Sequence, residues 1–210
     1  MKQPIIVLIG GIPGVGKTSI AGEIAREFGI DIVLSGDYLR EFIRPFGDFE
    51  KFKVMEKSIY EAWQYFGEKN PENIVSGFLA QSGVMNSGLN AIIHRALANG
   101  ENLIIEVLHF VPSQLGTELL KQIVPMYLYI EDIFLHAQRL RDRVNFTHAN
   151  SPGDRLADQL ETYRYMMRYS IEESQKYGIR VFENSDYNMT VKNVKKYIGE
   201  EVKRINGKPH

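Results

Sequence analysis

The sequence predicts an α/β fold in three layers, with a five-stranded parallel sheet between two layers of helices. Short apolar runs alternate with helical patterns along the chain, and a glycine-rich loop joins the first run to the first helix. A long stretch without a strand signal separates the second and third runs. Continuous apolar runs are typical of buried parallel strands, and alternation with helices favours right-handed crossovers between them.

Five apolar runs are expected to form the strands of this sheet. They are Pro4–Ile9, Ile30–Leu34, Asn102–Val107, Val124–Ile130 and Ile179–Phe182. Helical patterns lie at Lys17–Phe28, Asp37–Ile43, Asp132–Val144, Asp154–Tyr177 and Thr190–Ile205. The 210 residues contain no repeat and no obvious linker, so one domain covering 1–210 is expected.

The strand-free stretch, at about residues 45–100, predicts a helical insertion. Large apolar side chains recur at helical spacing from Phe49 to Phe66, and a second helical region follows Pro71 and ends at Gly100. Three glycines are expected to weaken this second region: Gly77, Gly83 and Gly88. The insertion is expected to cap the carboxyl ends of the strands, where ligands bind in open α/β sheets.

The loop after the first strand carries the motif G-x-x-x-x-G-K-[ST] in full, as Gly-Ile-Pro-Gly-Val-Gly-Lys-Thr. Its glycines allow backbone N–H groups to point at phosphate oxygens, and the following helix adds the positive end of its dipole. Lys17 is expected to bridge the outer phosphates of ATP, and the Thr18 hydroxyl to bind Mg²⁺. The motif predicts an adenylate-kinase-like P-loop NTPase fold with these nucleotide-binding residues: Gly11, Pro13, Gly14, Val15, Gly16, Lys17, Thr18 and Ser19.

Polar residues follow three other strands of the predicted sheet. Glu106 closes the third strand and is a candidate to hold Mg²⁺. Asp37 follows the second strand and is a candidate to orient or deprotonate the acceptor hydroxyl, although an N-cap role also fits. Asn184 follows the fifth strand in a polar turn that commonly edges the adenine ring in such folds.

Two groups of arginines are candidates for anion binding. Arg40 and Arg44 share a helix face and suit a carboxylate or phosphate of the acceptor. Arg139, Arg141 and Arg143 follow the fourth strand, where small P-loop kinases have a lid, here at about 136–155. Arg139 and Arg143 share a face and are the expected catalytic lid residues, and a solvated helix face is the alternative interpretation.

Composition and missing motifs restrict the function classes. No Asn-Lys-x-Asp element of guanine-nucleotide switches and no Leu-Ser-Gly-Gly-Gln signature of transporter ATPases is present, so a kinase is favoured. A net charge of −1 makes nucleic acid an unfavoured partner, and the absence of cysteine excludes disulfides and thiolate metal sites. No apolar stretch is long enough to cross a membrane, and a cytoplasmic enzyme is expected. Monomer and homodimer both stay open.

More particular motifs lie in the predicted cap and beyond it. They are Ser35-Gly-Asp-Tyr-Leu-Arg-Glu41, Tyr60-x-x-Trp63, Gly77-Phe-x-x-Gln81 and Glu106-x-x-His109-x-Val-Pro112. With the P-loop, the lid arginines and Phe182-Glu-Asn184, the chain resembles the kinase domain of archaeal 2-phosphoglycerate kinases over nearly its whole length. Members of that family usually carry an additional N-terminal nucleotide-binding region, whereas this sequence begins at the first strand.

The resemblance implies transfer of the γ-phosphoryl group of ATP to 2-phosphoglycerate, a small phosphorylated carboxylic acid, with Mg²⁺ as the metal. It also implies that Tyr60, Trp63, Gln81 and His109 bind the acceptor. Helical spacing alone equally fits Tyr60 and Trp63 as core residues, and Gln81 and His109 as structural polar groups. Two other functions stay open: a P-loop kinase for a nucleoside, RNA end or sugar nucleotide, and a slow ATPase that acts as a binding module.

Overall fold

The computed structural model describes residues 3–47, 49–142 and 153–207. Its centre is a five-stranded parallel sheet with the order β2-β3-β1-β4-β5. The strands are β1 (Ile6–Gly10), β2 (Ile32–Ser35), β3 (Leu103–Val107), β4 (Val124–Tyr129) and β5 (Arg180–Glu183). The expected α/β fold with five parallel strands is therefore confirmed, with strand ends within two residues of the predicted ones.

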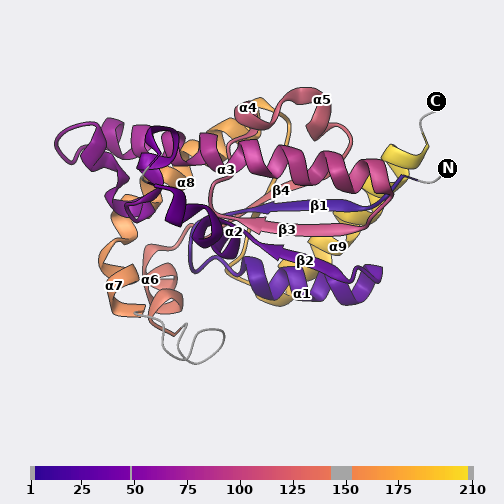
Figure 1. Cartoon of the computed structure of the whole chain (residues 1–210). Coiled ribbons are helices and arrows are strands. Elements are labelled where there is room, and N and C mark those ends of the chain that lie inside the picture. The colour runs from indigo at the N-terminus through magenta and orange to yellow at the C-terminus, as the bar shows by residue number, and fades with distance from the viewer. Residues whose placement is uncertain (1–2, 48, 143–152, 208–210) are drawn as a thin grey trace.

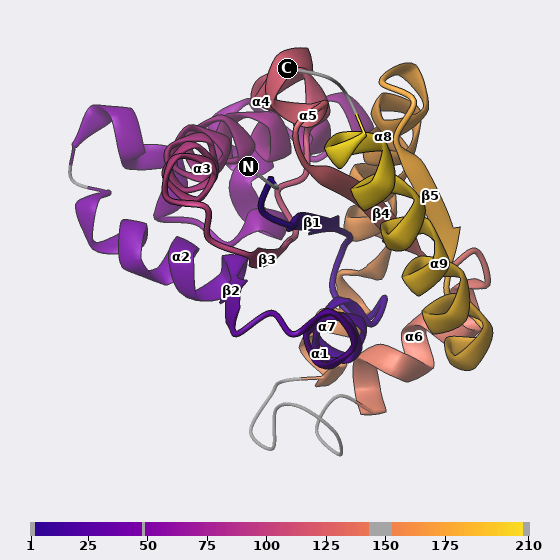
Figure 2. The ribbon, with the colours of Figure 1, turned by 90° about the vertical axis from the view of Figure 1, so that its right-hand side faces the viewer.

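Helices cover both faces of this sheet (Figures 1 and 2). On one face, α3 (Pro71–Asn99) packs beside α8 (Leu160–Lys176), with the short helices α4 (Pro112–Leu115) and α5 (Thr117–Leu120) next to them. On the other face, α1 (Lys17–Phe28) packs beside α9 (Tyr187–Asn206). Because β1 and β3 are covered on both faces, every residue in them is buried, and this explains their unbroken apolar runs.

The pairing register of β1, β2 and β3 brings three chain segments together at the carboxyl ends of these strands. Ile9 lies opposite Glu106, and Glu106 lies opposite Ser35 on its other side. The P-loop after β1, the end of β3 and the residues after β2 therefore meet at the carboxyl edge. The lack of a side chain at Gly36 allows the start of α2 to pack against the end of β3. A Cβ at this position would lie 2.9 Å from Val107 Cγ1 and 3.0 Å from the Glu106 carbonyl oxygen.

The segment between β2 and β3 is helical, as predicted, but its internal structure differs from the prediction. After α2 (Gly36–Ile43) and the 3₁₀ helix η1 (Arg44–Phe46), the stretch with helical spacing forms two 3₁₀ helices, η2 (Glu50–Met55) and η3 (Ile59–Tyr65), and no α-helix. α3 then runs for 29 residues without a break, so its glycines do not interrupt it. Figure 1 shows η1–η3 beyond the carboxyl ends of the strands, whereas α3 extends back along the sheet.

Gly77 has a packing role that its helical propensity does not reveal. A Cβ at this position would lie 2.5 Å from the Ala62 carbonyl carbon and 2.6 Å from the Trp63 nitrogen, both in the backbone of η3. Gly88, also in α3, has no atom within 4 Å of such a Cβ among the described residues. Gly77 therefore allows the backbone of η3 to pack directly against α3.

We expect Gly77→Ala to lower the free energy of unfolding by about 1–3 kcal/mol, because η3 must move to relieve the overlap. The matched change Gly88→Ala is expected to raise it by up to about 1 kcal/mol, since alanine is the better helix former. Urea unfolding followed by circular dichroism measures both. Equal effects of the two substitutions would contradict the close packing of η3 on Gly77.

The chain after β4 forms α6 (Ile133–Arg141), and α7 (Gly153–Asp158) precedes α8. The predicted helix over 154–177 is thus two helices, which meet at Gln159, where φ is −96° and ψ is 8°. The carboxylate of Asp132 caps α6 by accepting from the amides of Phe134 and Leu135. The predicted Arg143 lies outside the described residues, as does about half of the predicted lid.

No helix in residues 3–47, 49–142 and 153–207 is long and apolar enough to cross a membrane.

Candidate active site

The P-loop leaves β1 at Gly10 and enters α1 at Lys17. The Gly11 amide donates to the Val107 carbonyl (3.1 Å), so the first loop residue continues the pairing with β3. Gly14 and Gly16 have φ values of +84° and +91°, a conformation that side chains with a Cβ rarely adopt. The motif's glycines are therefore required by the backbone path that turns the loop back into the helix.

Three side chains hold carbonyl groups of the loop. Lys17 Nζ donates to the Ile12 carbonyl (3.3 Å), His136 Nε2 to the Pro13 carbonyl (2.8 Å) and Asn184 Nδ2 to the Val15 carbonyl (2.8 Å). His136 and Asn184 are completely buried. A loop whose carbonyls are bound from outside is suited to present its N–H groups to phosphate oxygens on the inside.

A pocket of about 460 Å³ opens at the P-loop, a volume in the range of small-molecule sites. It brings together ten of the predicted site residues from the P-loop, α1, α2, β3, α6 and the turn after β5. They are Pro13, Gly14, Gly16, Lys17, Thr18, Ser19, Asp37, Glu106, Arg139 and Asn184. Gly11 and Val15 are buried in the loop itself and do not line the pocket.

Thr18 and Glu106 form the candidate metal-binding pair. The Thr18 hydroxyl donates to Glu106 Oε1 at 3.2 Å, and Glu106 is only 7% exposed. Mg²⁺ prefers oxygen ligands and is usually held by one or two protein groups together with substrate phosphates and water. An adjacent hydroxyl and carboxylate at the mouth of a phosphate loop fit that ion. The described residues contain no cluster of three or more histidine or acidic side chains that would suggest another kind of metal.

Asp37 and Arg139 face the same pocket from opposite ends of the sheet. Asp37 is exposed in the first turn of α2, two residues after the paired Ser35. Arg139 is partly buried on α6, and its Nη2 donates to the Ser185 carbonyl (2.8 Å). Arg141 is exposed and pairs with Asp154 at 3.7 Å, away from the pocket. The geometry therefore distinguishes Arg139 from Arg141.

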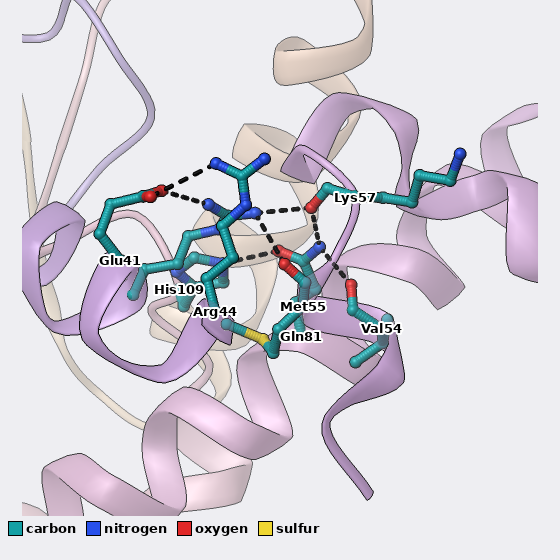
Figure 3. Close-up of polar contacts among 8 residues, drawn as sticks. Glu41, Arg44, Val54, Met55, Lys57, Gln81 and His109 are labelled. Atoms are coloured by element: carbon teal, nitrogen blue, oxygen red, sulfur yellow. Dashed lines mark hydrogen bonds and ion pairs between the residues drawn. The ribbon is translucent and has the colours of Figure 1, made fainter. Parts of the chain in front are cut away.

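Of the residues expected to bind the acceptor, Asp37 lines the pocket, whereas Arg40, Gln81 and His109 belong to a hydrogen-bonded network outside its lining. Arg40 Nη2 donates to the carbonyls of Met55 (3.2 Å) and Lys57 (2.5 Å). Gln81 Nε2 donates to the carbonyls of Val54 (2.7 Å) and Lys57 (2.8 Å), as Figure 3 shows. This network fixes the turn between η2 and η3, so it shapes the cap.

His109 lies under this network. Its Nε2 is 3.3 Å from Gln81 Oε1, and its ring stacks on Phe78 with centroids 6.5 Å apart. Burial lowers the pKa of His109 to about 3, with Arg40 and Lys17 acting in the same direction and Asp37 against them. The imidazole is therefore neutral at pH 7. Because Gln81 Oε1 only accepts, Nε2 carries the ring proton.

Arg44, Tyr60 and Trp63 also lie outside the pocket lining. Arg44 is about half exposed and pairs with Glu41 at 3.3 Å. Tyr60 packs edge-on against Tyr163, and Trp63 Nε1 donates to the Tyr60 carbonyl (3.0 Å). Both aromatic residues are partly buried against the main core. Contact of these three residues with an acceptor stays a prediction.

Four residues of the site region were not among the predicted ones. Leu108, Asp142 and Tyr187 line the pocket, and His136 lies beneath the P-loop. All four stand in segments already singled out: Leu108 follows Glu106 by two residues, Tyr187 follows Asn184 by three, and His136 and Asp142 lie in the predicted lid at about 136–155. The role of His136 follows from a long-range contact, because its partner Pro13 lies 123 residues away in the sequence.

The fold and the pocket place the chain among the P-loop kinases, enzymes that use ATP and Mg²⁺ and phosphorylate small molecules. It belongs to the AAA domain family, whose sequence profile matches residues 7–161.

Two proteins of similar sequence and one solved structure of similar fold can be compared with this chain. It is 51% identical over 182 residues to a mevalonate-3-phosphate 5-kinase of Thermoplasma acidophilum, covering 87% of this chain and 89% of the relative. It is 32% identical to a 2-phosphoglycerate kinase of Methanocaldococcus jannaschii, covering 97% of this chain but 66% of that enzyme. A shikimate kinase of Acinetobacter baumannii has a similar fold, with a TM-score of 0.55 at 17% identity over 99% of this chain and 97% of that one.

Proposed function

We propose that this kinase transfers the γ-phosphoryl group of ATP to the 5-hydroxyl of mevalonate 3-phosphate. The observation that carries the proposal is the 51% identity to the Thermoplasma acidophilum enzyme, which extends over 89% of that enzyme. Mevalonate 3-phosphate is a hydroxy acid that carries a phosphate group. It therefore belongs to the class of phosphorylated carboxylic acids that the sequence predicts as acceptors, but it replaces 2-phosphoglycerate as the preferred member.

We assign separate roles in this reaction to polar residues that line the pocket. Lys17 binds the outer phosphates of ATP, and Thr18 and Glu106 would hold Mg²⁺, which neutralises phosphate charge when bound. The acceptor oxygen forms a bond to the γ-phosphorus as the bond from that phosphorus to the ADP oxygen breaks. Asp37 orients the attacking hydroxyl or takes its proton, and Arg139 stabilises charge on the transferred group.

The acceptor's anionic groups are assigned to the side of the site next to α2 and the cap. Arg40 and Arg44 supply positive charge there, while Tyr60, Trp63, Gln81 and His109 form the surrounding wall or the support behind it. A neutral His109 can still donate a hydrogen bond to a phosphate, but only if the bond to Gln81 is exchanged. The network beside Arg40 is thus the part of the cap that an acceptor would rearrange.

A second candidate acceptor is 2-phosphoglycerate. Supporting it are the 32% identity over 208 residues to the Methanocaldococcus jannaschii enzyme and the motifs shared with that family. This chain spans 66% of that enzyme's length, whereas it spans 89% of the mevalonate-3-phosphate 5-kinase. The same site chemistry serves both acceptors, because both present a hydroxyl, a carboxylate and a phosphate.

A coupled assay of ADP release with Mg²⁺·ATP tests the proposal against a panel of acceptors. The panel contains mevalonate 3-phosphate, mevalonate, 2-phosphoglycerate, 3-phosphoglycerate, glycerate and short RNA. We expect strong stimulation by mevalonate 3-phosphate and a kcat/KM for mevalonate lower by about 10²-fold or more, because mevalonate lacks the phosphate that Arg40 and Arg44 would bind.

Each other outcome has a definite meaning. Stimulation by 2-phosphoglycerate alone would overturn the mevalonate proposal in favour of the second candidate. Equal ADP release with and without every acceptor would indicate a slow ATPase that acts as a binding module. Stimulation by RNA is not expected, because several basic side chains of α9 are already paired: Lys195 with Glu23 and Glu27, and Arg204 with Glu201.

A further inference from the structure

We infer that His136 is a positioning residue that joins the P-loop to the arginine-bearing helix α6, so that a single hydrogen bond sets both nucleotide affinity and the placement of Arg139. This inference rests on the ATP site of the proposed function and does not depend on which acceptor is used. His136 comes from the segment after β4, whereas its partner Pro13 follows β1.

The side chains by which α6 contacts the loop are buried and closely packed. His136 and Leu140 are one helical turn apart and both completely buried. A Cβ on Gly14 would lie 2.8 Å from Leu140 Cδ2 and 3.3 Å from His136 Cδ2, so the loop backbone rests directly on these two side chains. Within this packing, Nε2 of His136 reaches the Pro13 carbonyl at 2.8 Å.

The protonation state of His136 follows from its surroundings. Burial lowers the pKa of His136 to about 4, so the ring is neutral at pH 7. A carbonyl oxygen can only accept, and Nε2 must therefore carry the proton of the neutral ring. The other nitrogen, Nδ1, is buried and has no hydrogen-bond partner among the described residues. The bond to Pro13 is thus the polar contact that orients the imidazole.

Helix α6 is held in place at its N-terminus, and its residue Arg139 lines the pocket. Arg164 of α8 donates to the carbonyls of Ile130 (3.2 Å) and Glu131 (2.9 Å), just before the Asp132 cap of α6. One turn after His136, Arg139 lines the pocket and donates to Ser185. A helix held at its start and at the P-loop leaves Arg139 little freedom. Loss of the His136 contact would loosen the loop and the arginine together.

Two substitutions separate this hydrogen bond from simple packing. Gln Nε2 occupies nearly the position of His Nε2, whereas Asn Nδ2 occupies that of Nδ1 and cannot reach Pro13. We expect His136→Asn to weaken Mg²⁺·ADP binding by about tenfold in calorimetry, since the Pro13 carbonyl loses its donor. We expect His136→Gln to recover most of the affinity. His94→Asn, at an exposed position of α3, is the control and leaves the affinity unchanged.

Kinetics test the link to Arg139. We expect His136→Asn to raise the KM for ATP and to lower kcat, with little change in the KM for the acceptor. In an Arg139→Ala background, the same substitution should change kcat by less than about twofold while its effect on ADP affinity persists, because residues that act together are not additive. Equal weakening by Asn and Gln, or unchanged ADP affinity in both, would overturn the inference.

A measurement on the unaltered protein covers the case in which these variants fail to fold. Long-range ¹H–¹⁵N correlation spectra distinguish the two neutral histidine tautomers, and proximity of its ring protons to Gly14 assigns the His136 signal among the five histidines of the wild-type chain. We expect the Nε2–H tautomer at pH 7 and a shift of that signal on addition of Mg²⁺·ADP. An Nδ1–H tautomer, or no response to nucleotide, would contradict the assignment. Nucleotide binding needs no acceptor, so a failure here is separate from a failure of the mevalonate 3-phosphate proposal.

Discussion

Replacing Lys17 by alanine is expected to reduce phosphoryl transfer by about 10³-fold or more while the protein stays folded. Lys17 lies at the junction of the P-loop and α1, lines the pocket and donates to the Ile12 carbonyl at 3.3 Å. Its positive charge acts where negative charge is redistributed during transfer, in a partly buried position where water screens charges weakly. Single-turnover rates of the purified variant measure the effect.

The control for this prediction is Lys192→Ala on α9, which removes an exposed lysine that does not line the pocket and is expected to leave the rate unchanged. Thermal unfolding of both variants separates loss of chemistry from loss of structure. If Lys17→Ala keeps more than about a tenth of the wild-type rate, the nucleotide is not bound in this loop as described, since such a residue is worth at least 10²-fold.

Substitution of Asp37 is expected to have the second largest effect, a decrease in kcat of about 10²–10⁴-fold for Asp37→Ala. The side chain lines the pocket at the end of β2, and it reaches this place because β2 pairs with β3 next to Glu106. ADP affinity is expected to stay within about threefold of wild type, because a group that acts on the acceptor contributes to the transition state and not to nucleotide binding. This pattern differs from that of Lys17.

Asp37→Asn then distinguishes two roles. An asparagine can still accept a hydrogen bond from the acceptor hydroxyl, but it cannot take its proton. Recovery of most of the rate in Asp37→Asn would identify an orienting group, and a loss equal to that of Asp37→Ala would identify a general base. Asp31→Asn, an exposed change just before the start of β2, serves as the control. An unchanged kcat in both Asp37 variants would show that the acceptor does not bind beside α2.

The sequence predicted the fold class because its signals are local. The continuous apolar runs of β1 and β3 reflect burial on both faces, and the spacing of Gly11, Gly16 and Lys17 describes one loop conformation. Local signals predicted the cap less well. The spacing from Phe49 to Phe66 suggested one α-helix where 3₁₀ helices form, since packing against α3 overrides the weak preference of a short segment.

The residues of the candidate site divide in the same way. The P-loop, Asp37 and Glu106 follow strands whose carboxyl ends meet, so topology alone placed them together. Arg40, Gln81 and His109 were chosen for their chemistry, but their polar atoms bind one another and the turn at Val54–Lys57. A polar group that is removed from water must find a partner, and the sequence does not say which one.

By itself, the sequence determined that a phosphate loop, an acid and a set of arginines stand on a parallel α/β sheet, because those features depend on neighbours in the chain and on strand order. Only the tertiary structure decided that Arg40, Gln81 and His109 lie outside the lining of the pocket, and that His136 supports the loop from 123 residues away. The reason is physical. Side-chain direction and hydrogen-bond partners are set by packing between elements that are distant in sequence, and no spacing along the chain encodes that packing.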